Sequence, residues 1–159
     1  MKIKVNIGEQ TLQLFNDAGK LVKSFAVSTA LNGAGEEANS NCTPRGRHVI
    51  RAKIGTGQPL NTVFVRRRPS GEIYTPALGL QYPDRDWILT RILWLSGCEP
   101  GYNRLGTCDT MRRYIYIHGT TAERGVGIAR SHGCINMLND DLLELYELVE
   151  AGTVVEISV

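Results

Sequence analysis

The N-terminal part of the chain alternates short β-prone runs with turn signals, and this pattern limits the possible folds more than any other feature. Residues 2–7 and 11–16 each alternate apolar and polar side chains around a turn at residues 8–10, which predicts a β-hairpin. Another turn at residues 16–19 leads into a third predicted strand over residues 20–29. Consecutive strands joined by short turns favour a β-sandwich or barrel over a fold of alternating strands and helices.

The later strands are marked by apolar runs between loops that contain glycine and proline. Residues 88–96 form the most apolar segment of the chain, which predicts a strand in the core. The run of three arginines at residues 66–68 is interpreted as a solvated strand edge, where basic side chains discourage aggregation, with an anion site as the alternative. Strands are expected at residues 47–54, 63–65, 88–96, 110–117 and 154–157.

One helical signal lies near the C-terminus, over residues 139–151. Asn139 is a suitable N-cap, and the two aspartates that follow it suit the positive end of a helix dipole. Gly152 is a natural stop for this helix. The apolar positions that recur at helical spacing are Leu142, Leu145, Tyr146 and Val149. The helix is therefore expected to pack against the core rather than to bind a cofactor.

The segment from residue 114 to residue 136 carries the residue types needed for chemistry. The β-prone run of residues 114–117 delivers His118 into a loop rich in glycine and threonine. Twelve residues separate His118 from Ser131, which opens the block Ser-His-Gly-Cys that ends at Cys134. Glycine beside each reactive side chain permits a tight turn and the close approach of a substrate carbonyl.

A cysteine and an imidazole in this arrangement are the two parts of an activated sulfur nucleophile. A free thiol with a pKa of about 8.5 is mostly un-ionised at neutral pH, and a neighbouring imidazolium lowers that pKa to roughly 3.5–7.5. We therefore expect Cys134 to be the nucleophile and His118 to take or hold its proton. Backbone N–H groups near Gly133 and Cys134 are expected to form an oxyanion hole.

This order of residues carries a family resemblance. His-Gly-Thr, a loop of a dozen residues, and then Ser-His-Gly-Cys-apolar-Asn resembles the signature of the L,D-transpeptidase catalytic domain, the YkuD family. The resemblance includes the turn at residues 43–46 (Thr-Pro-Arg-Gly), which looks like a structural landmark of the family rather than a catalytic element. It implies one catalytic domain over residues 1–159, mainly β and of the β-sandwich type, with one C-terminal helix near residues 139–151.

The resemblance and the local sequence suggest roles for the remaining residues of the motif. By resemblance, the backbone carbonyl of Gly119 orients the imidazole, where other hydrolases use a carboxylate. Arg130 could bind a substrate carboxylate, with a solvated loop charge as the equal alternative, and Asn136 could hydrogen-bond the loop or the substrate. Support of the loop and of the oxyanion hole is expected from Ser131, His132 and Gly133.

The reaction that the resemblance implies is ping-pong acyl transfer on a peptidoglycan stem peptide, without a metal or an organic cofactor. The bond attacked is the L,D bond between a diamino acid and the terminal D-alanine. Water as the acceptor would make the enzyme an L,D-carboxypeptidase in murein recycling, whereas an amine would give 3-3 cross-links or exchange of D-amino acids in the cell wall. The first residues show no apolar stretch of the roughly 7–15 residues found in signal peptides. Hydrolysis of muropeptides in the cytoplasm is therefore favoured, with the periplasm as the alternative if a leader has been removed.

Size and charge exclude several other classes. A chain of 159 residues with 42% hydrophobic content predicts one domain with a sizeable core. The net charge is only +2, whereas a domain that binds nucleic acid usually has a basic stripe and a pI above about 9. No run approaches the length of about 18 apolar residues that a membrane helix needs. We expect neither a nucleic-acid nor a membrane partner, and the sequence does not predict an oligomeric state.

Two alternatives use the same reactive residues. His118, His132, Cys134 and Cys108 could be zinc ligands of a non-catalytic module, although the spacing lacks the paired cysteines of such sites. A sortase-like enzyme also places histidine before cysteine, but it needs an arginine after the cysteine, and none lies between Cys134 and the C-terminus. The other cysteines, Cys42, Cys98 and Cys108, are expected to be reduced, although the last two could pair in an oxidising compartment.

Overall fold

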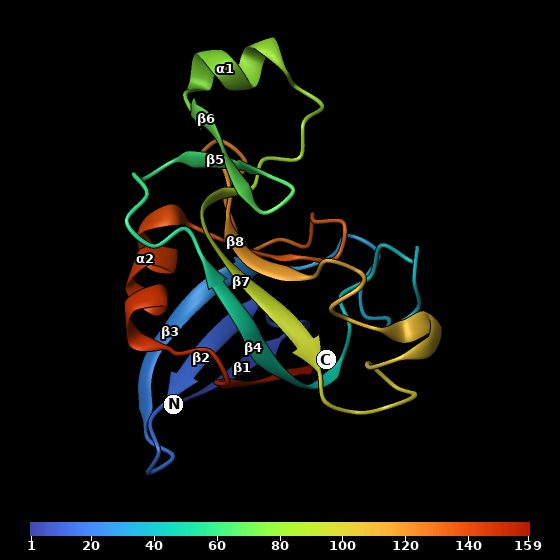
Figure 1. The fold of residues 1–159 in the computed structure, drawn as a ribbon. Coiled ribbons are helices and arrows are strands. Elements are labelled where there is room, and N and C mark those ends of the chain that lie inside the picture. The colour runs from blue at the N-terminus through green and yellow to red at the C-terminus, as the bar shows by residue number, and fades with distance from the viewer.

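Ten strands hydrogen-bond into one sheet in the computed structural model of residues 1–159 (Figure 1). Two α-helices and one short 3₁₀ turn accompany them. The strands are β1 (Lys2–Asn6), β2 (Thr11–Phe15), β3 (Leu21–Ser28), β4 (Gly46–Ile54), β5 (Thr62–Val65), β6 (Arg68–Ile73), β7 (Leu89–Gly97), β8 (Tyr116–Gly119), β9 (Ile135–Met137) and β10 (Val154–Ser158). The helices are α1 (Pro76–Gln81) and α2 (Asn139–Leu148), and the 3₁₀ turn is η1 (Gly106–Cys108). Neither α-helix has the length and apolar character to cross a membrane.

The sheet closes into a barrel because β4 is paired along both of its edges. The order β4-β10-β1-β2-β3-β9-β8-β7 returns to β4 through a β4–β7 pairing. A register shift between Ile50 and Ala52 marks a bulge in β4, and a bulge bends a strand and increases its twist. The mainly β fold is confirmed. The β-sandwich arrangement is corrected to a barrel, because inward and outward side chains alternate in both and the sequence pattern does not separate them.

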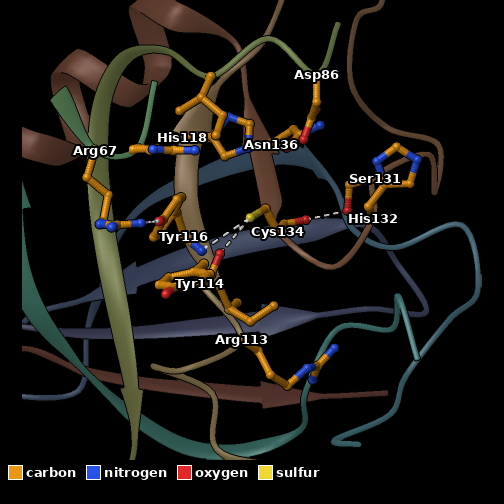
Figure 2. A pocket seen from close by; sticks show the side chains of 13 residues that line it. Arg67, Asp86, Arg113, Tyr114, Tyr116, His118, Ser131, His132, Cys134 and Asn136 are labelled. Carbon is orange, nitrogen blue, oxygen red and sulfur yellow. Dashed lines mark hydrogen bonds between the residues drawn. The ribbon is translucent and has the colours of Figure 1, made fainter. Parts of the chain in front are cut away.

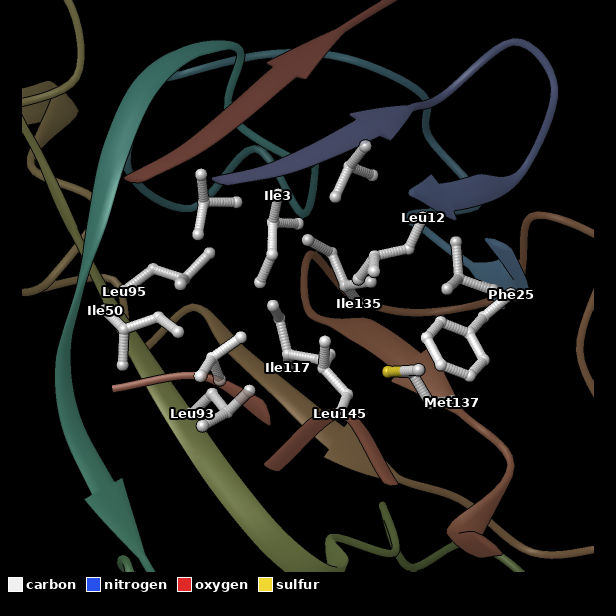
Figure 3. Packing of buried hydrophobic residues seen from close by; sticks show 14 of the residues in the cluster. Ile3, Leu12, Phe25, Ile50, Leu93, Leu95, Ile117, Ile135, Met137 and Leu145 are labelled. Atoms are coloured by element: carbon white, nitrogen blue, oxygen red, sulfur yellow. The ribbon is translucent and has the colours of Figure 1, made fainter. Parts of the chain in front are cut away.

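The core fills the interior of this barrel (Figure 3). Ile117 of β8 and Ile135 of β9 are fully buried in it and face each other across a parallel pair of strands. Because successive side chains on a strand point to opposite faces, His118 and Asn136 lie on the outer face of the barrel. The same alternation places Cys134, which precedes Ile135, on that outer face.

The C-terminal helix is confirmed, with one correction at its start. The N-cap is Leu138 and makes no side-chain cap bond, so that Asn139 is the first helical residue rather than the cap. The side chain of Asn139 is used elsewhere, as described below. At the other end of α2, Lys53 Nζ donates to the carbonyls of Tyr146 and Val149 at 2.7 Å each, which satisfies groups that have no partner within the helix.

Three elements were not predicted, and one strand begins later than expected. β6, α1 and β9 are not among the elements that the sequence predicts, and residues 110–114 form turns rather than the first half of a strand that runs to residue 117. Tyr114 has a φ of 56°, which is incompatible with a β-strand. β5 and β6 form a hairpin that continues the sheet beyond β7, where Val63 pairs with Leu89. In Figure 1 this hairpin and α1 rise above one end of the barrel.

We expect His48 to make the fold sensitive to acid. Burial lowers its pKa from 6.5 to about 4. Below pH 6.5, His48 therefore binds a proton in the unfolded chain but not in the folded protein. The free energy of unfolding should fall by about 3 kcal/mol as the pH drops from 6.5 to 4, and should not respond to His48 above that window. Urea denaturation at several pH values would measure the slope. His48→Gln should reduce the slope and leave the part contributed by His118, whose pKa burial also lowers. His132→Gln, at an exposed position, should not reduce it; equal slopes in wild type and His48→Gln would contradict the expectation.

Candidate active site

The parallel pairing of β8 and β9 brings the two predicted reactive residues together. His118 is opposite Asn136 in the register, and Cys134 lies two residues before Asn136. Side chains two apart on a strand share a face, so the imidazole, the thiol and the Asn136 amide project into the same space. Figure 2 shows the three around one cavity.

This cavity has a volume of about 440 Å³ and combines the predicted motif with residues from distant parts of the chain. Arg66 and Arg67 reach it from the tip of the β5–β6 hairpin, and Asp86 from the segment before β7. Arg113 lies below Cys134 in Figure 2, on the side away from Asp86. The full lining is Arg66, Arg67, Asp86, Ile88, Arg113, Tyr114, Ile115, Tyr116, His118, Ser131, His132, Cys134 and Asn136.

The tautomer of His118 is set by the backbone. His118 is 1% exposed, and its Nδ1 lies 2.7 Å from the carbonyl oxygen of Gly119. A carbonyl only accepts, so Nδ1 carries the proton and donates it, and Nε2 is left with a free lone pair. This is the contact expected for Gly119. Burial lowers the pKa of His118, against the opposing effects of the Asp86 charge and the Gly119 carbonyl.

Gly119 is a glycine because Asn139 approaches it closely. A Cβ on Gly119 would lie 2.0 Å from Asn139 Oδ1 and 2.6 Å from the Leu89 carbonyl oxygen. The Asn139 amide donates to the Thr120 carbonyl at 2.9 Å, and its oxygen accepts from the Thr90 hydroxyl at 2.7 Å. The start of α2 therefore fixes the peptide that orients the imidazole.

The Cys134 sulfur lies in a backbone cradle, and burial rather than the cradle contacts keeps its thiol protonated. The Tyr116 N–H donates to Sγ at 3.3 Å, and the thiol donates to the Tyr114 carbonyl at 3.4 Å. Burial raises the pKa of Cys134 to about 12, although the Tyr116 N–H and the Arg113 charge act in the opposite direction. With the pKa of His118 lowered, the resting pair is a neutral thiol and a neutral imidazole. It differs from the thiolate beside an imidazolium that the sequence suggested.

The block from Ser131 to Cys134 is braced by its own serine. Ser131 Oγ donates to the Cys134 carbonyl at 2.5 Å and accepts from the Gly133 N–H at 3.2 Å. Gly133 has a φ of 132°, a conformation that favours glycine. The His132 side chain lies beside Ser131 at the edge of the cavity in Figure 2 and is exposed. Because Gly133 N–H is already paired with Ser131, it is not free to serve as an oxyanion donor.

The structure separates the two predicted substrate-binding residues. Asn136 is 2% exposed and lines the cavity, and its amide oxygen has no hydrogen-bond partner. Arg130 does not line the cavity, and its guanidinium donates instead to the Arg124 carbonyl, while Arg124 donates to the Arg130 carbonyl at 2.9 Å. This mutual pairing holds the loop that precedes Ser131.

The arginines at the hairpin tip belong to the site, although the sequence favoured a solvated edge. Arg67 donates to the Tyr116 hydroxyl at 3.0 Å and lies over the rings of Trp94 and Tyr114 at 5.1 and 4.7 Å. Arg66 and Arg67 have φ values of 49° and 66°, as in the two-residue turns of tight hairpins. The sequence gives little sign of this turn, because such turns usually contain asparagine and glycine and the segment that follows, Arg-Pro-Ser-Gly-Glu-Ile, is not β-prone.

The zinc hypothesis has no geometric basis in this arrangement. No group of three or more histidine, cysteine or acidic side chains is positioned to hold a metal ion. Cys108 is buried in η1, where its thiol donates to the Leu105 carbonyl at 3.3 Å. All four cysteines are free, so Cys98 and Cys108 do not pair.

The neutral thiol predicts a slow and base-dependent alkylation of Cys134. Thiolate is the reacting form, and a pKa near 12 should make iodoacetamide react about 100-fold more slowly than with glutathione at pH 7.5, after allowance for the greater nucleophilicity of a more basic thiolate. Peptide mass spectrometry of Cys134 between pH 5 and 10 would record the rate, which should rise throughout. A plateau above an inflection near pH 6 would instead show a thiolate–imidazolium pair.

Comparison with known proteins agrees with this site. The profile of the YkuD family, described as the L,D-transpeptidase catalytic domain, matches residues 1–157. The chain is 47% identical to the probable L,D-transpeptidase ErfK/SrfK of Escherichia coli K12 over 157 residues, which are 98% of this chain and 43% of that protein. It is 33% identical to the probable L,D-transpeptidase YbiS of the same organism over 123 residues, 71% of this chain and 39% of that protein. The chain thus spans about two fifths of the length of these relatives.

Solved structures agree on the fold. L,D-transpeptidase 3 from Mycobacterium tuberculosis superposes with a TM-score of 0.59 at 16% identity, over 99% of this chain and 60% of that one. An L,D-transpeptidase from Mycobacterium smegmatis gives a TM-score of 0.57 at 19% identity, over 99% of this chain and 58% of that one. With a family profile that covers nearly every residue, this barrel, and an imidazole on β8 beside a thiol that immediately precedes β9, the chain belongs to the YkuD family of L,D-transpeptidase catalytic domains.

Proposed function

We propose that this chain is a cysteine acyltransferase that acts on the L,D bond of peptidoglycan stem tetrapeptides and passes the acyl group to an amine. The observation that carries the proposal is the pairing of β8 with β9, which places His118 and Cys134 in one cavity. Membership of the L,D-transpeptidase family and the names of the relatives support the substrate class.

The proposed reaction begins with attack of Cys134 Sγ on the carbonyl carbon of the diamino acid. As the S–C bond forms, the thiol proton moves to Nε2 of His118, and negative charge develops on the carbonyl oxygen. The tetrahedral intermediate collapses by breaking the C–N bond, and the proton on His118 passes to the departing nitrogen of D-alanine. The product of this half-reaction is a thioester on Cys134 and free D-alanine.

The second half-reaction reverses these roles. The amine of an acceptor attacks the thioester carbonyl and gives a proton to His118, and the C–S bond then breaks. The Cys134 sulfur leaves and recovers its proton from the imidazole. A neutral resting pair fits this cycle, because the thiol loses its proton only when a carbonyl is in place to be attacked, and His118 with its lowered pKa is unprotonated at neutral pH.

The charge in the cavity favours a donor that ends in a carboxylate. Arg67 is held by Tyr116 and the aromatic rings, whereas the Arg66 guanidinium has no bonded partner in the protein and faces the same cavity. Arginine binds carboxylates through two parallel hydrogen bonds. We assign the terminal carboxylate of D-alanine to Arg66, and an amide N–H of the stem to the unpaired oxygen of Asn136. Arg130 stays a candidate only for parts of the substrate that extend beyond the cavity.

Hydrolysis, which the sequence favoured, is the competing outcome for the same thioester. Water and an amine attack the same carbonyl, and both use His118 as the base. The L,D-transpeptidase names of the relatives favour the amine. A recycling carboxypeptidase would release the tripeptide whether or not an amine is present.

Mass spectrometry of a muropeptide tetrapeptide incubated with the protein, with and without excess D-methionine, would test the proposal. We expect free D-alanine and a product that carries D-methionine in place of D-alanine, at a rate that Cys134→Ala reduces below detection. Tripeptide alone, unchanged by D-methionine, would make the protein a carboxypeptidase. Turnover that persists in Cys134→Ala, or no turnover in wild type, would overturn the acyltransferase proposal.

A further inference from the structure

Thr43 lies far from the catalytic block in the sequence and touches it in the fold. Its hydroxyl donates to the carbonyl of Gly133 at 2.9 Å, a contact between residues 90 apart. Thr43 is 0% exposed and does not line the cavity. From this contact we propose that Thr43 is a positioning residue for catalysis, which aims the Cys134 N–H at the developing oxyanion. The proposal rests on the cysteine acyl transfer proposed above.

The Thr43 hydroxyl has only one direction in which to donate. Its oxygen accepts from the Ala30 N–H at 2.9 Å, so its single proton is left for the Gly133 carbonyl. The backbone around it is also fixed. The Thr43 N–H donates to the Gly33 carbonyl and the Thr43 carbonyl accepts from Gly35, both at 2.9 Å. Proline at the next position further restricts Thr43 to extended conformations.

A fixed Gly133 carbonyl fixes the N–H on the other side of the same peptide. The peptide between Gly133 and Cys134 is trans, since the chain contains no cis peptide bond, and in a trans peptide the C=O and the N–H point in opposite directions. With its carbonyl held by Thr43, this peptide turns the Cys134 N–H away from Thr43. That N–H donates to no other group of the protein.

Of the backbone N–H groups of Gly133 and Cys134, only the N–H of Cys134 is left to donate to an oxyanion. The Gly133 N–H is taken by Ser131 Oγ, which also holds the Cys134 carbonyl. Thr43 and Ser131 therefore brace the two peptides that flank the Cys134 Cα from opposite ends. Loss of one oxyanion donor typically slows acyl transfer by about 10²–10³. Misalignment of a donor that is still present should have a smaller effect.

Two reactions of Cys134 distinguish an oxyanion role from a purely structural one. Acylation by p-nitrophenyl acetate forms an S–C bond, breaks the C–O bond to p-nitrophenolate and sends the thiol proton to His118, through a tetrahedral oxyanion. Alkylation by iodoacetamide displaces iodide from carbon and forms no oxyanion. Both can be followed at pH 9, the first by nitrophenolate absorbance and the second by mass spectrometry, with the Cys134→Ala rate subtracted.

We expect Thr43→Val, which keeps the shape and removes the hydroxyl, to slow acylation by about 10–100-fold and to leave alkylation within about twofold of wild type. Thr43→Ser should restore acylation to near the wild-type rate. Thr110→Val is the matched control, because Thr110 is also 0% exposed and its hydroxyl bonds His48, away from the catalytic block. It should lower stability without changing either rate. Circular dichroism would verify folding, and Thr43→Ala would replace Thr43→Val if the latter does not fold.

Equal slowing of both reactions by Thr43→Val would show that Thr43 affects only the reactivity of the thiol. An unchanged acylation rate would show that Thr43 has no role in the reaction. Either result overturns the proposal. Because p-nitrophenyl acetate needs only the thiol, the base and the oxyanion donor, this test does not depend on recognition of a stem peptide. Failure to turn over a muropeptide, with a normal loss of acylation in Thr43→Val, would refute the substrate assignment and leave the role of Thr43 intact.

Discussion

The parallel register between β8 and β9 is the constraint on which the site depends. It places His118 opposite Asn136, with Cys134 two residues before Asn136, while Ile117 and Ile135 anchor the same strands in the core. A shift of one residue in either strand would exchange the inner and outer faces and bury the wrong side chains. The apolar packing inside the barrel and the reactive geometry outside it are therefore enforced by the same pairing.

Each reactive side chain is then oriented by backbone rather than by another side chain. The imidazole is held through the Gly119 carbonyl, and that peptide is confined by Asn139 at the start of α2. The sulfur is held between the Tyr116 N–H and the Tyr114 carbonyl. Such backbone contacts are made by almost any residue type, which explains why no third catalytic side chain stands out in the sequence. The residues whose identity matters are instead Asn139 and Thr43, because their side chains fix the position of this backbone.

The sequence predicted the reactive pair, the hairpin of β1 and β2, the buried β7 and the C-terminal helix, because each has a local signal in periodicity or motif. It did not predict the closure of the sheet, because this depends on β4 pairing with two strands distant in sequence. The local sequence favours Asn139 as a helix cap, but its amide donates to the Thr120 carbonyl and its oxygen accepts from the Thr90 hydroxyl. The sequence favours a solvated edge for Arg66 and Arg67, because the turn that carries them to the cavity lacks the usual turn residues. The closure of the sheet and the contacts of Asn139 arise from long-range contacts, whereas the β5–β6 turn was missed for this local reason.

The backbone cradle of Cys134 has a consequence for the oxidation of its thiol. Peroxides and disulfides react with thiolates, and an exposed thiol of low pKa progresses readily to sulfenic and then irreversible sulfinic acid. A thiol whose pKa is raised to about 12 by burial offers almost none of the vulnerable form between turnovers. In the acyl transfer proposed above, Cys134 reacts with a bound carbonyl but offers oxidants little thiolate in the empty site.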